Sequence, residues 1–346
     1  MDRRNFLLST GAALTSVSVA PMCLASTNAL PPAAASPRRL TVSVANYASA
    51  NPTVVQANLL ARTLEATSAT ALHVEVVDAT AVPDADLSLV TASALVDRDV
   101  GFAFVTGLPG NQALDAAALD EWLMRGGGQP LLDQLAATHG LKVLAAAHSG
   151  DSFLWSQAPF ESAADFAGKA VQTDGLARHV AAGLGAEPWR ILDAEPAVSF
   201  AQGRLAAIEC CIPGLVSAQM HALTRTAMSG ALAPHGTTAA LTVKLETWQA
   251  FSPEDKALMS AAARTNYLES VTLNRRFANL NRRALAQTYN ITIAPPTNAL
   301  SAAIQTVSRA MVASAAASSG AAKNLNASYM SFLMNPLNSN GENCHV

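Results

Sequence analysis

The sequence SPEDKALMSAAARTNYLESVTLNRRFANLNRRALAQTY, residues 252–289, decides the fold class. Ser252 can cap a helix, Pro253 suits the first helical position, and Asp255 stands three residues after the cap. Neither Gly nor Pro follows before Pro295. At 1.5 Å per residue the predicted helix is roughly 50 Å long, which is more than one lobe of ordinary size. Its apolar positions keep no heptad, so we expect a strut that crosses between two lobes rather than a coiled coil.

Outward from this helix, strands alternate with helices. Alternating or short apolar runs predict strands, whereas apolar positions at a spacing of three and four residues predict helices. Such alternation favours an α/β fold with parallel or mixed sheets. The expected strands are 40–45, 72–77, 101–105, 141–147, 169–173, 189–192, 205–210 and 239–245, and the other expected helices are 52–68, 175–184, 197–202 and 299–322.

The composition excludes several classes of protein. A chain of 346 residues can form two lobes. The net charge of -3 leaves no basic field for nucleic acid or an anionic membrane. Beyond the N-terminus, no uninterrupted run of about 20 apolar residues predicts a membrane span. Four cysteines are too few for a disulfide scaffold, and we expect the adjacent Cys210 and Cys211 to be free thiols.

The first 25 residues predict an export signal and therefore a periplasmic protein. Arg3 and Arg4 precede a mildly apolar run, and small residues allow cleavage after about Ala20 or Ala25. The arginine pair favours the twin-arginine route, with an ordinary Sec signal as the alternative. Residues 26–38 predict a flexible leader, and residues 335–346 predict a disordered tail.

Five short motifs follow one another in the middle of the chain. They are WLMRGGG at 122–128, Trp155 followed by DFAGKAVQT at 165–173, LGAEP at 184–188, QGRLAAIE at 202–209 and WQAFSPED at 248–255. In order and spacing they resemble the periplasmic substrate-binding proteins of TRAP transporters, especially the branch that binds keto acids and related small acids. The resemblance extends from about residue 40 to 290.

The resemblance implies a two-lobed α/β clamp of the periplasmic-binding-protein type, with a long helix spanning both lobes and a ligand between them. We expect the first lobe to comprise 39–152 and about 236–270, and the second to comprise 153–235 and about 271–334. The implied partners are a small-molecule solute and the membrane subunits of a TRAP transporter, and a homodimer is one assembly the resemblance allows. It implies no covalent step, no enzymatic cofactor and no nucleic acid.

The resemblance also implies a divergent pocket. Most members place an arginine for the substrate carboxylate where this chain has Gln172. Asp151 and Glu209 match the positions that hold a cation in the keto-acid branch, and Cys210 replaces a common aromatic residue. Together with Trp155, these side chains are expected to face one cleft. Asp151 and Glu209 are the implied metal ligands, and calcium, magnesium or sodium is the implied ion.

Two acids without an arginine would repel an anionic ligand, whereas a cation, a cationic ligand or a neutral polyol would suit them. On this hypothesis Gln172→Arg improves the binding of acids, because an Arg fork donates two parallel hydrogen bonds to a carboxylate. Alternatives remain at each position. Arg178 or Arg190 supplies the base if the register slips. Independently of the register, the alternatives to a site role are a structural ion pair for Glu209, a loop cap for Asp151 and core packing for Trp155.

Motifs of enzymes are missing from the sequence. It has no Gly-x-Ser-x-Gly, and its seven histidines include no pair at metal-binding i,i+4 spacing. The glycines 126–128 lack the Lys-Ser or Lys-Thr of a phosphate loop, so a turn is expected there. The alternative function is an exported α/β enzyme or ligand sensor with a cysteine in its cleft.

Overall fold

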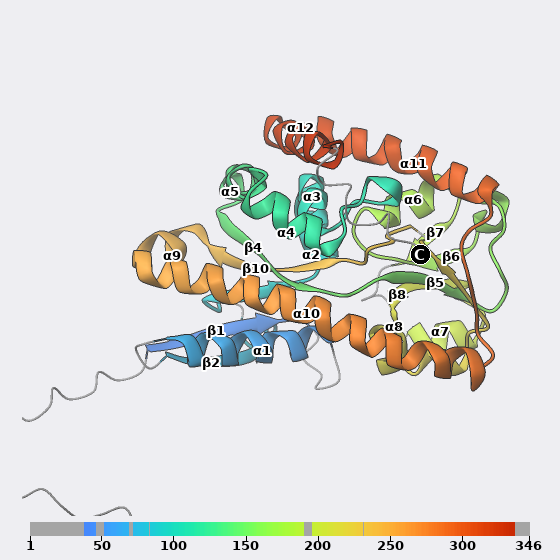
Figure 1. Ribbon diagram of the computed structural model, residues 1–346, viewed down its shortest axis with the longest axis horizontal. Helices are drawn as coiled ribbons and strands as arrows, with labels where there is room; N and C mark the ends of the chain where they lie inside the picture. Colours follow the sequence, from blue (N-terminus) through green and yellow to red (C-terminus); the bar gives the residue numbers. More distant parts are fainter. Residues whose placement is uncertain are drawn as a thin grey trace, which may run out of the picture. The chain divides into compact units, whose positions relative to one another are not determined.

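A computed structural model describes residues 38–45, 52–68, 72–82, 84–189, 196–230 and 232–335 (Figure 1). The predicted export signal, leader and tail lie outside the described residues, apart from Arg38 and Asn335. Of the described helices, none combines the length and hydrophobicity that crossing a membrane requires.

The first lobe is built on a five-stranded mixed sheet. Its strand order is β2-β1-β3-β10-β4, in which β1 is parallel to β2 and β3, while β10 is antiparallel to β3 and β4. The strands are β1 (Arg38–Val44), β2 (Leu72–Asp78), β3 (Leu87–Val90), β4 (Leu141–His148) and β10 (Thr238–Lys244). The late strand β10 therefore completes a sheet that the first part of the chain began.

The second lobe is built on a six-stranded mixed sheet. Its order is β11-β9-β5-β8-β6-β7, with β5 antiparallel to both β8 and β9. The strands are β5 (Ser152–Ser156), β6 (Ala170–Gln172), β7 (Glu187–Trp189), β8 (Ala207–Cys211), β9 (Thr226–Ser229) and β11 (Thr292–Ala294). The predicted two-lobed α/β clamp is confirmed.

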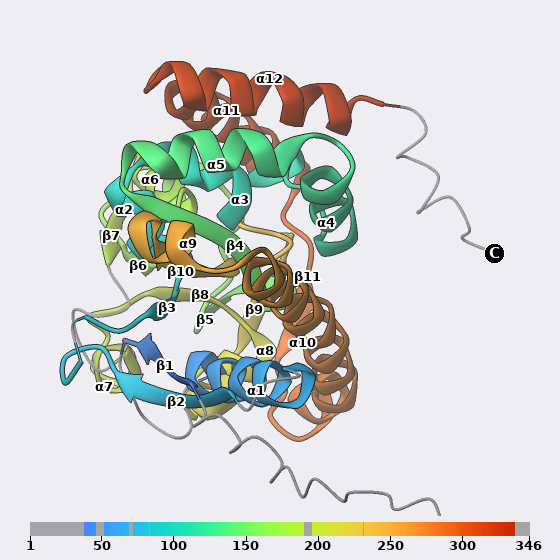
Figure 2. The same cartoon turned by 90° about the vertical axis from the view of Figure 1, so that its left-hand side faces the viewer.

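Helices cover both faces of each sheet (Figure 2). In the first lobe, α1 and the start of α10 bury one face, and α2 to α5 with α12 bury the other. In the second lobe, α6 and the start of α11 bury one face, and α7, α8 and the end of α10 bury the other. The bounds are α1 (Pro52–Thr67), α2 (Ala92–Arg98), α3 (Ala103–Thr106), α4 (Ala116–Met124), α5 (Gly128–Thr138), α6 (Ala177–Gly183), α7 (Pro196–Ala201), α8 (Ile212–Ser217), α9 (Leu245–Ala250), α10 (Pro253–Gln287), α11 (Asn298–Ala317) and α12 (Gly320–Leu333).

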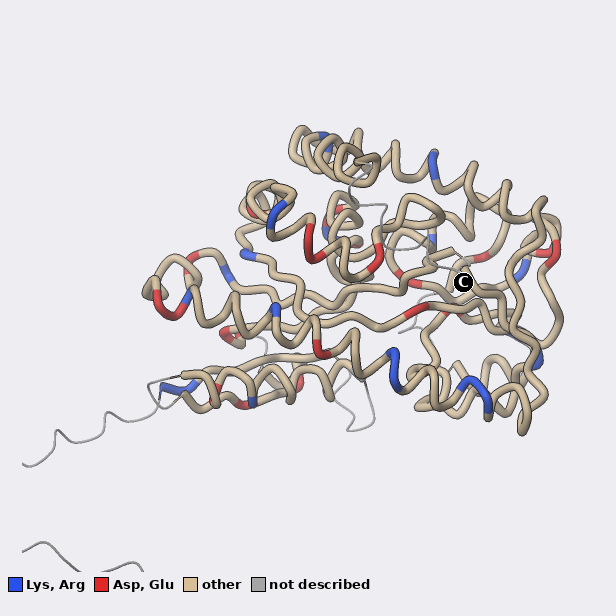
Figure 3. The backbone as a smooth tube through the Cα atoms, viewed as in Figure 1, with Lys and Arg blue, Asp and Glu red and all other residues tan. Residues whose placement is uncertain are grey.

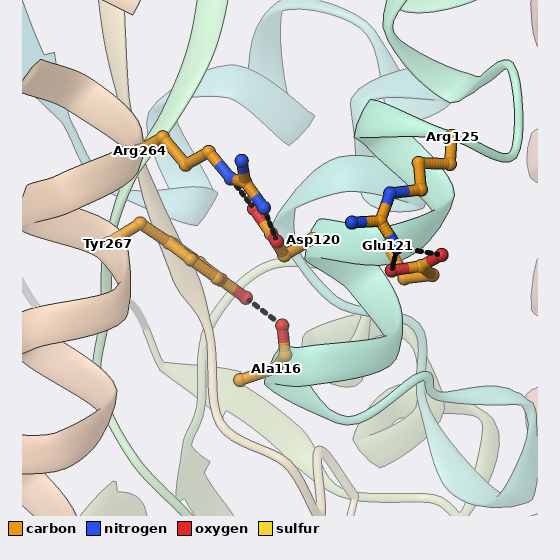
Figure 4. A network of polar contacts seen from close by, with 6 residues as sticks. All are labelled: Ala116, Asp120, Glu121, Arg125, Arg264 and Tyr267. Carbon is orange, nitrogen blue, oxygen red and sulfur yellow. Dashed lines mark hydrogen bonds and ion pairs between the residues drawn. The ribbon is translucent and has the colours of Figure 1, made fainter. Parts of the chain in front are cut away.

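The helix α10 is the predicted strut. The Ser252 hydroxyl accepts a hydrogen bond from the backbone N–H of Asp255 at 3.0 Å, so the predicted cap is formed. The first half of α10 packs on α1 and β4, and Leu285 near its end lies in the core of the second lobe. Figure 4 shows Arg264 of α10 paired through two hydrogen bonds, of 2.9 and 2.8 Å, with Asp120 of α4.

Two predictions about secondary structure are wrong. Residues 101–105 form a turn of 3₁₀-helix and α3 rather than a strand, because the Asp99 carboxylate accepts from the N–H of Gly101 and starts a helical turn. A short apolar run does not distinguish a buried strand from a buried helix. The expected helix 299–322 is two helices, because α11 ends at Ala317 and the side chain of Ser319 caps the N-terminus of α12. In addition, α12 packs on α5 of the first lobe, although 271–334 was expected to belong to the second.

The glycine turn at 126–128 fits closely around Trp122. A Cβ on Gly128 would lie 2.7 Å from the Trp122 ring, and the backbone of Gly127 is left-handed, with a φ of 81°. Trp122 is fully buried and donates from its ring nitrogen to the Ser328 hydroxyl of α12 at 3.1 Å. This motif therefore fixes the core of the first lobe.

Candidate functional site

Two chain segments cross between the lobes side by side, one joining β4 to β5 and the other joining β9 to β10. The N–H of Ser149 donates to the carbonyl of Thr237 at 3.0 Å, and the N–H of Thr237 donates to the Ser149 hydroxyl at 2.8 Å. Gly236 has a φ of 70°, and a Cβ there would lie 1.8 Å from the carbonyl oxygen of Gly150. Only glycine permits this contact, so the two crossing segments are held together backbone to backbone.

The helix α10 is attached to the end of β4 by a row of polar side chains four residues apart. Asn266 donates from its amide nitrogen to the carbonyl of Ala146 at 2.7 Å, and Asn274 does so to the carbonyl of His148 at 2.5 Å. Between them, the Ser270 hydroxyl accepts from the N–H of His148 at 2.8 Å. The spacing i, i+4, i+8 places all three on one face of the helix. The helix is therefore fixed to the first lobe up to the point where the chain crosses.

His148 lies at this crossing and has a strongly lowered pKa. It is 7% exposed, and its Nδ1 accepts a hydrogen bond from the N–H of Gly150 at 3.0 Å. The ring also interacts with the backbone of His235. Burial lowers the pKa of His148 from 6.5 to about 4, and the nearby His235 adds to the effect. The ring is therefore neutral at neutral pH and lies against both crossing segments.

An interlobe cavity of about 100 Å³ lies between this crossing and α2. Both lobes contribute residues to its wall, including residues of α1, α8 and α10. It is lined by Thr53, Gln56, Thr91, Ala92, Ala147, His148, Ser149, Asp174, Cys211, Pro213, Thr237, Ala239 and Asn274. Among these described lining residues there is no Lys or Arg. Such a volume holds about three waters or one small solute.

An outer groove of about 120 Å³ adjoins the interlobe cavity. The two share five lining residues, namely His148, Ser149, Cys211, Pro213 and Asn274. The groove is more charged than the cavity, because the second half of α10, whose basic residues are visible in Figure 3, forms one side of it. Its charged and titratable lining residues beyond His148 are Asp115, Asp151, His235, Arg275 and Arg282.

The lobes also meet at α2, on the wall of the interlobe cavity that includes Ala92. Asp174 of the second lobe accepts a hydrogen bond from Ser93 of the first, and Arg178 forms an ion pair with Asp97. A Cβ on Gly175 would lie 3.6 Å from that of Ala92, so the backbones are close here. The lobes are therefore in contact both at the crossing segments and at α2, with the cavity between the two contacts.

A larger hollow of about 390 Å³ lies within the first lobe, between α4, α5, β4 and α10. Its charged side chains are already paired, since Arg264 binds Asp120 and Lys142 binds Asp133 through two contacts of 2.6 Å each. The hollow touches no residue of the second lobe. We therefore place the candidate site in the interlobe cavity.

A clamp of two α/β lobes with a cavity at their junction is the architecture of a solute receptor, and the comparison with known families agrees. The family model described as bacterial extracellular solute-binding protein, family 7, matches residues 48–319, which is more than half of the chain. The chain belongs to this family. Its members are receptors rather than enzymes, so the TRAP-type resemblance is confirmed and the protein is not an enzyme. No curated protein matches the sequence.

Solved TRAP periplasmic solute-binding proteins share the fold of this family 7 protein. One from Pseudoalteromonas atlantica, with bound sodium and pyruvate, has a TM-score of 0.77 at 18% identity and covers 86% of this chain and 94% of its own. One from Bordetella bronchiseptica, with calcium and picolinate, has a TM-score of 0.76 at 16% identity and covers 86% of this chain and 92% of its own. DctP7 of Bordetella pertussis, an extracytoplasmic solute receptor that binds pyroglutamic acid, has a TM-score of 0.69 at 18% identity and covers 84% of this chain and 99% of its own.

The expectation that five side chains face one cleft fails for two of them in this receptor. Trp155 is fully buried and donates from its ring nitrogen to the carbonyl of Cys210 at 2.9 Å, inside the core of the second lobe. Gln172 pairs with Ile208 across β6 and β8, which puts its side chain on the same face of the sheet as Trp155. It is 2% exposed and lines neither the cavity nor the groove. Gln172→Arg would thus bury a guanidinium, and the improved binding of acids is no longer expected.

Glu209 points to the opposite face of the sheet from Gln172, because it follows Ile208 on β8. Its carboxylate accepts from the Thr173 hydroxyl at 2.5 Å and from the N–H of Ala233 at 2.7 Å, with the N–H of Leu232 as a further donor. Burial raises the pKa of Glu209, and these donated hydrogen bonds oppose that rise. Glu209 therefore holds the β9–β10 connection and the end of β6 in place, and the alternative of a structural ion pair is wrong as well.

We predict that Glu209→Gln lowers the free energy of unfolding by about 1–3 kcal/mol, because an amide leaves at least one buried donor without an acceptor. Urea denaturation followed by circular dichroism measures this loss. The matched control is Glu187→Gln, an exposed acid on β7, for which a change within about 0.5 kcal/mol is expected. Equal stability of the two variants would contradict the role given to Glu209.

The other predicted residues lie nearer the candidate site. Asp151 is exposed and lines the outer groove. Cys210 is partly buried beside Trp155, whereas its neighbour Cys211 lines the cavity, because successive residues of a strand face opposite sides. Both thiols are free, as predicted for these two described cysteines. Burial raises the pKa of each, so neither is an activated nucleophile.

The predicted metal pair does not fit an ion. Both oxygens of Glu209 are occupied by donors from the protein, and Asp151 lies in the outer groove, which Glu209 does not line. Within the described ranges, no group of three or more His, Cys, Asp or Glu is arranged to hold a metal.

Sequence reasoning missed Gln56, His148, Asp174 and Asn274, which line the cavity. Each lies at an element end or on a helix face whose partner is far away in the sequence. One signal was available. Asp174 follows directly on the strand of the DFAGKAVQT motif, and the carboxyl ends of parallel strands are common ligand sites.

Proposed function

We propose that this protein captures a small solute in the interlobe cavity and delivers it to the membrane subunits of a TRAP-type secondary transporter. The observation that carries the proposal is the cavity itself, which is walled by both lobes and lies between their two points of contact. A solute bound there touches both lobes and favours their closed arrangement. The relatives that bind pyruvate, picolinate and pyroglutamic acid indicate the size class of the solute.

We further propose that the pocket lacks the usual carboxylate-binding arginine. The matching position, Gln172, is buried in the second lobe, and the described lining of the cavity contains no Lys or Arg. The alternative base Arg178 is paired with Asp97, and Arg190 lies outside the described residues. Two arginines that the sequence did not suggest, Arg275 and Arg282, line the outer groove.

Other parts of the proposal concern the setting of the receptor. The family is periplasmic, and cleavage of an export signal after about Ala20 or Ala25 remains a prediction. A homodimer also remains a prediction, suggested by one related structure described as a dimer. A cation accompanies the ligand in two relatives, but Asp151 and Glu209 do not form a site for one here. The members of the family are receptors rather than enzymes, and a ligand sensor would use Cys211, which lines the cavity where Cys210 was expected.

A thermal-shift screen of the exported, processed protein tests the proposal. The panel contains pyruvate, picolinate, succinate, pyroglutamate, small polyols, small amines and divalent salts. We expect one solute to stabilise the protein in a saturable way, by about 2.7 kcal/mol at a hundredfold excess over its Kd. Mass spectrometry should recover that solute unchanged. Conversion of the solute, or a panel without any stabilising member, would count against a receptor.

A further inference from the structure

Two hydrogen-bond acceptors from opposite lobes lie on the wall of the interlobe cavity. Gln56 of α1 belongs to the first lobe, and its Oε1 is buried without a hydrogen-bond partner in the described part of the chain. Asp174 follows β6 in the second lobe and is partly buried. An unsatisfied buried acceptor costs free energy until a donor reaches it. Gln56 therefore needs a donor, whereas Asp174 accepts from the N–H of Gly175 at 2.8 Å and from Ser93 and still has lone pairs left for a further donor.

Several of the protein's own donors around the cavity are already used. The Asn274 amide nitrogen donates to the carbonyl of His148, and the N–H of Thr237 donates to the Ser149 hydroxyl. The Thr91 hydroxyl pairs with that of Ser93 at 3.1 Å. His148 is neutral, its Nδ1 accepts from the N–H of Gly150, and its ring also interacts with the backbone of His235. A carboxylate in this cavity would thus meet the carboxyl group of Asp174 without a Lys or Arg among the described lining residues to offset it.

We infer that the part of the solute inside the interlobe cavity is a donor, a hydroxyl or an ammonium group, held by Gln56 and Asp174. This inference rests on the proposed function and assigns the two specificity-determining residues of its site. A solute that donates to both side chains links the first lobe to the second, so recognition and closure depend on the same contacts. Ser93 already donates to Asp174 across the lobes, which fixes the carboxyl group in place. Burial also raises the pKa of Asp174, and an ammonium group would relieve that cost.

Three probes of similar size test the inference, namely 1-amino-2-propanol, lactamide and lactate. Calorimetry with the wild-type receptor is expected to show tighter binding of the first two than of lactate. Asp174→Asn should weaken 1-amino-2-propanol by about tenfold or more, because a charge-assisted hydrogen bond is lost. The same variant should bind lactate more tightly than the wild type does. Gln56→Met removes the other acceptor and should weaken both donor probes.

Glu121→Gln is the matched control, since Glu121 is an exposed acid paired with Arg125 outside the cavity. It should leave all three affinities unchanged. Lactate binding at least as tightly as the donor probes in the wild type overturns the inference, and so does an Asp174→Asn variant that keeps the wild-type order. A wild type that ignores all three probes but binds an acid of the wider panel overturns it as well and leaves the proposed function standing. If no solute of either set binds, the proposed function fails too.

Discussion

Replacing Gly236 by alanine should lower the free energy of unfolding by about 3 kcal/mol or more. Two costs add at this position. The backbone has a φ of 70°, which a residue with a Cβ adopts only under strain. In addition, the new Cβ would lie 1.8 Å from the carbonyl oxygen of Gly150, so the two crossing segments must separate. Urea denaturation at neutral pH measures the loss.

The control for Gly236→Ala separates the cost of the close contact between the two crossing segments from the cost of the strained backbone. Gly140 has nearly the same φ, 68°, but a Cβ there meets nothing within 4 Å. Gly140→Ala should therefore lose only the cost of the left-handed backbone, about 1 kcal/mol. If both variants lose the same amount, the contact between Gly236 and Gly150 contributes nothing, and the packed crossing described above is wrong. We also expect Gly236→Ala to weaken solute binding, because Thr237 lines the cavity.

Acidification should destabilise the protein between pH 6.5 and about 4 through His148. The histidine has a folded pKa of about 4, whereas its ordinary value is 6.5. Between these values the unfolded chain binds a proton that the folded chain does not, so stability falls as the pH falls. The stabilisation that comes from the lowered pKa of His148 is complete above pH 6.5 and is lost by about pH 4. The difference of pKa corresponds to about 3 kcal/mol.

The variant His148→Gln tests this assignment, because glutamine can accept and donate hydrogen bonds but does not titrate. It should be less stable than the wild type at pH 7 and should lose less stability between pH 6.5 and 4. The groups that face His148 are His235 and Asp115, and both remain in the variant. His73→Gln, at an exposed histidine of β2, should keep the wild-type profile. An equally steep acid loss in His148→Gln would show that another group is responsible.

The long helix and the alternation of strands and helices could be predicted because they depend on local chemistry. A Ser-Pro start and a run without Gly or Pro specify α10 wherever the chain goes afterwards. The family motifs could be recognised for a similar reason, since their glycines and tryptophans meet local needs. The turn at Gly126–Gly128 bends around a tryptophan only a few residues away.

The candidate site was predicted poorly because its contacts join residues far apart in the sequence. The face on which Gln172 lies depends on the register between β6 and β8, and a shift of one residue reverses every side chain. Glu209 was expected to bind a ligand, but its partners are Thr173 and Ala233, which only folding brings to it. The burial of Glu209 is tolerated because hydrogen-bond donors surround its carboxyl group, and the sequence pattern does not predict these donors.

The sequence by itself determined that this protein is a two-lobed α/β receptor joined by a long helix, because helix caps, periodicity and family motifs are local properties. The tertiary structure alone decided which side chains meet between the lobes. Gln56 and Asp174 are separated by more than a hundred residues, and they face one cavity only because β10 returns to the first sheet and α10 fixes the crossing. Contacts of that kind are set by chain topology and packing, which depend on the whole chain at once.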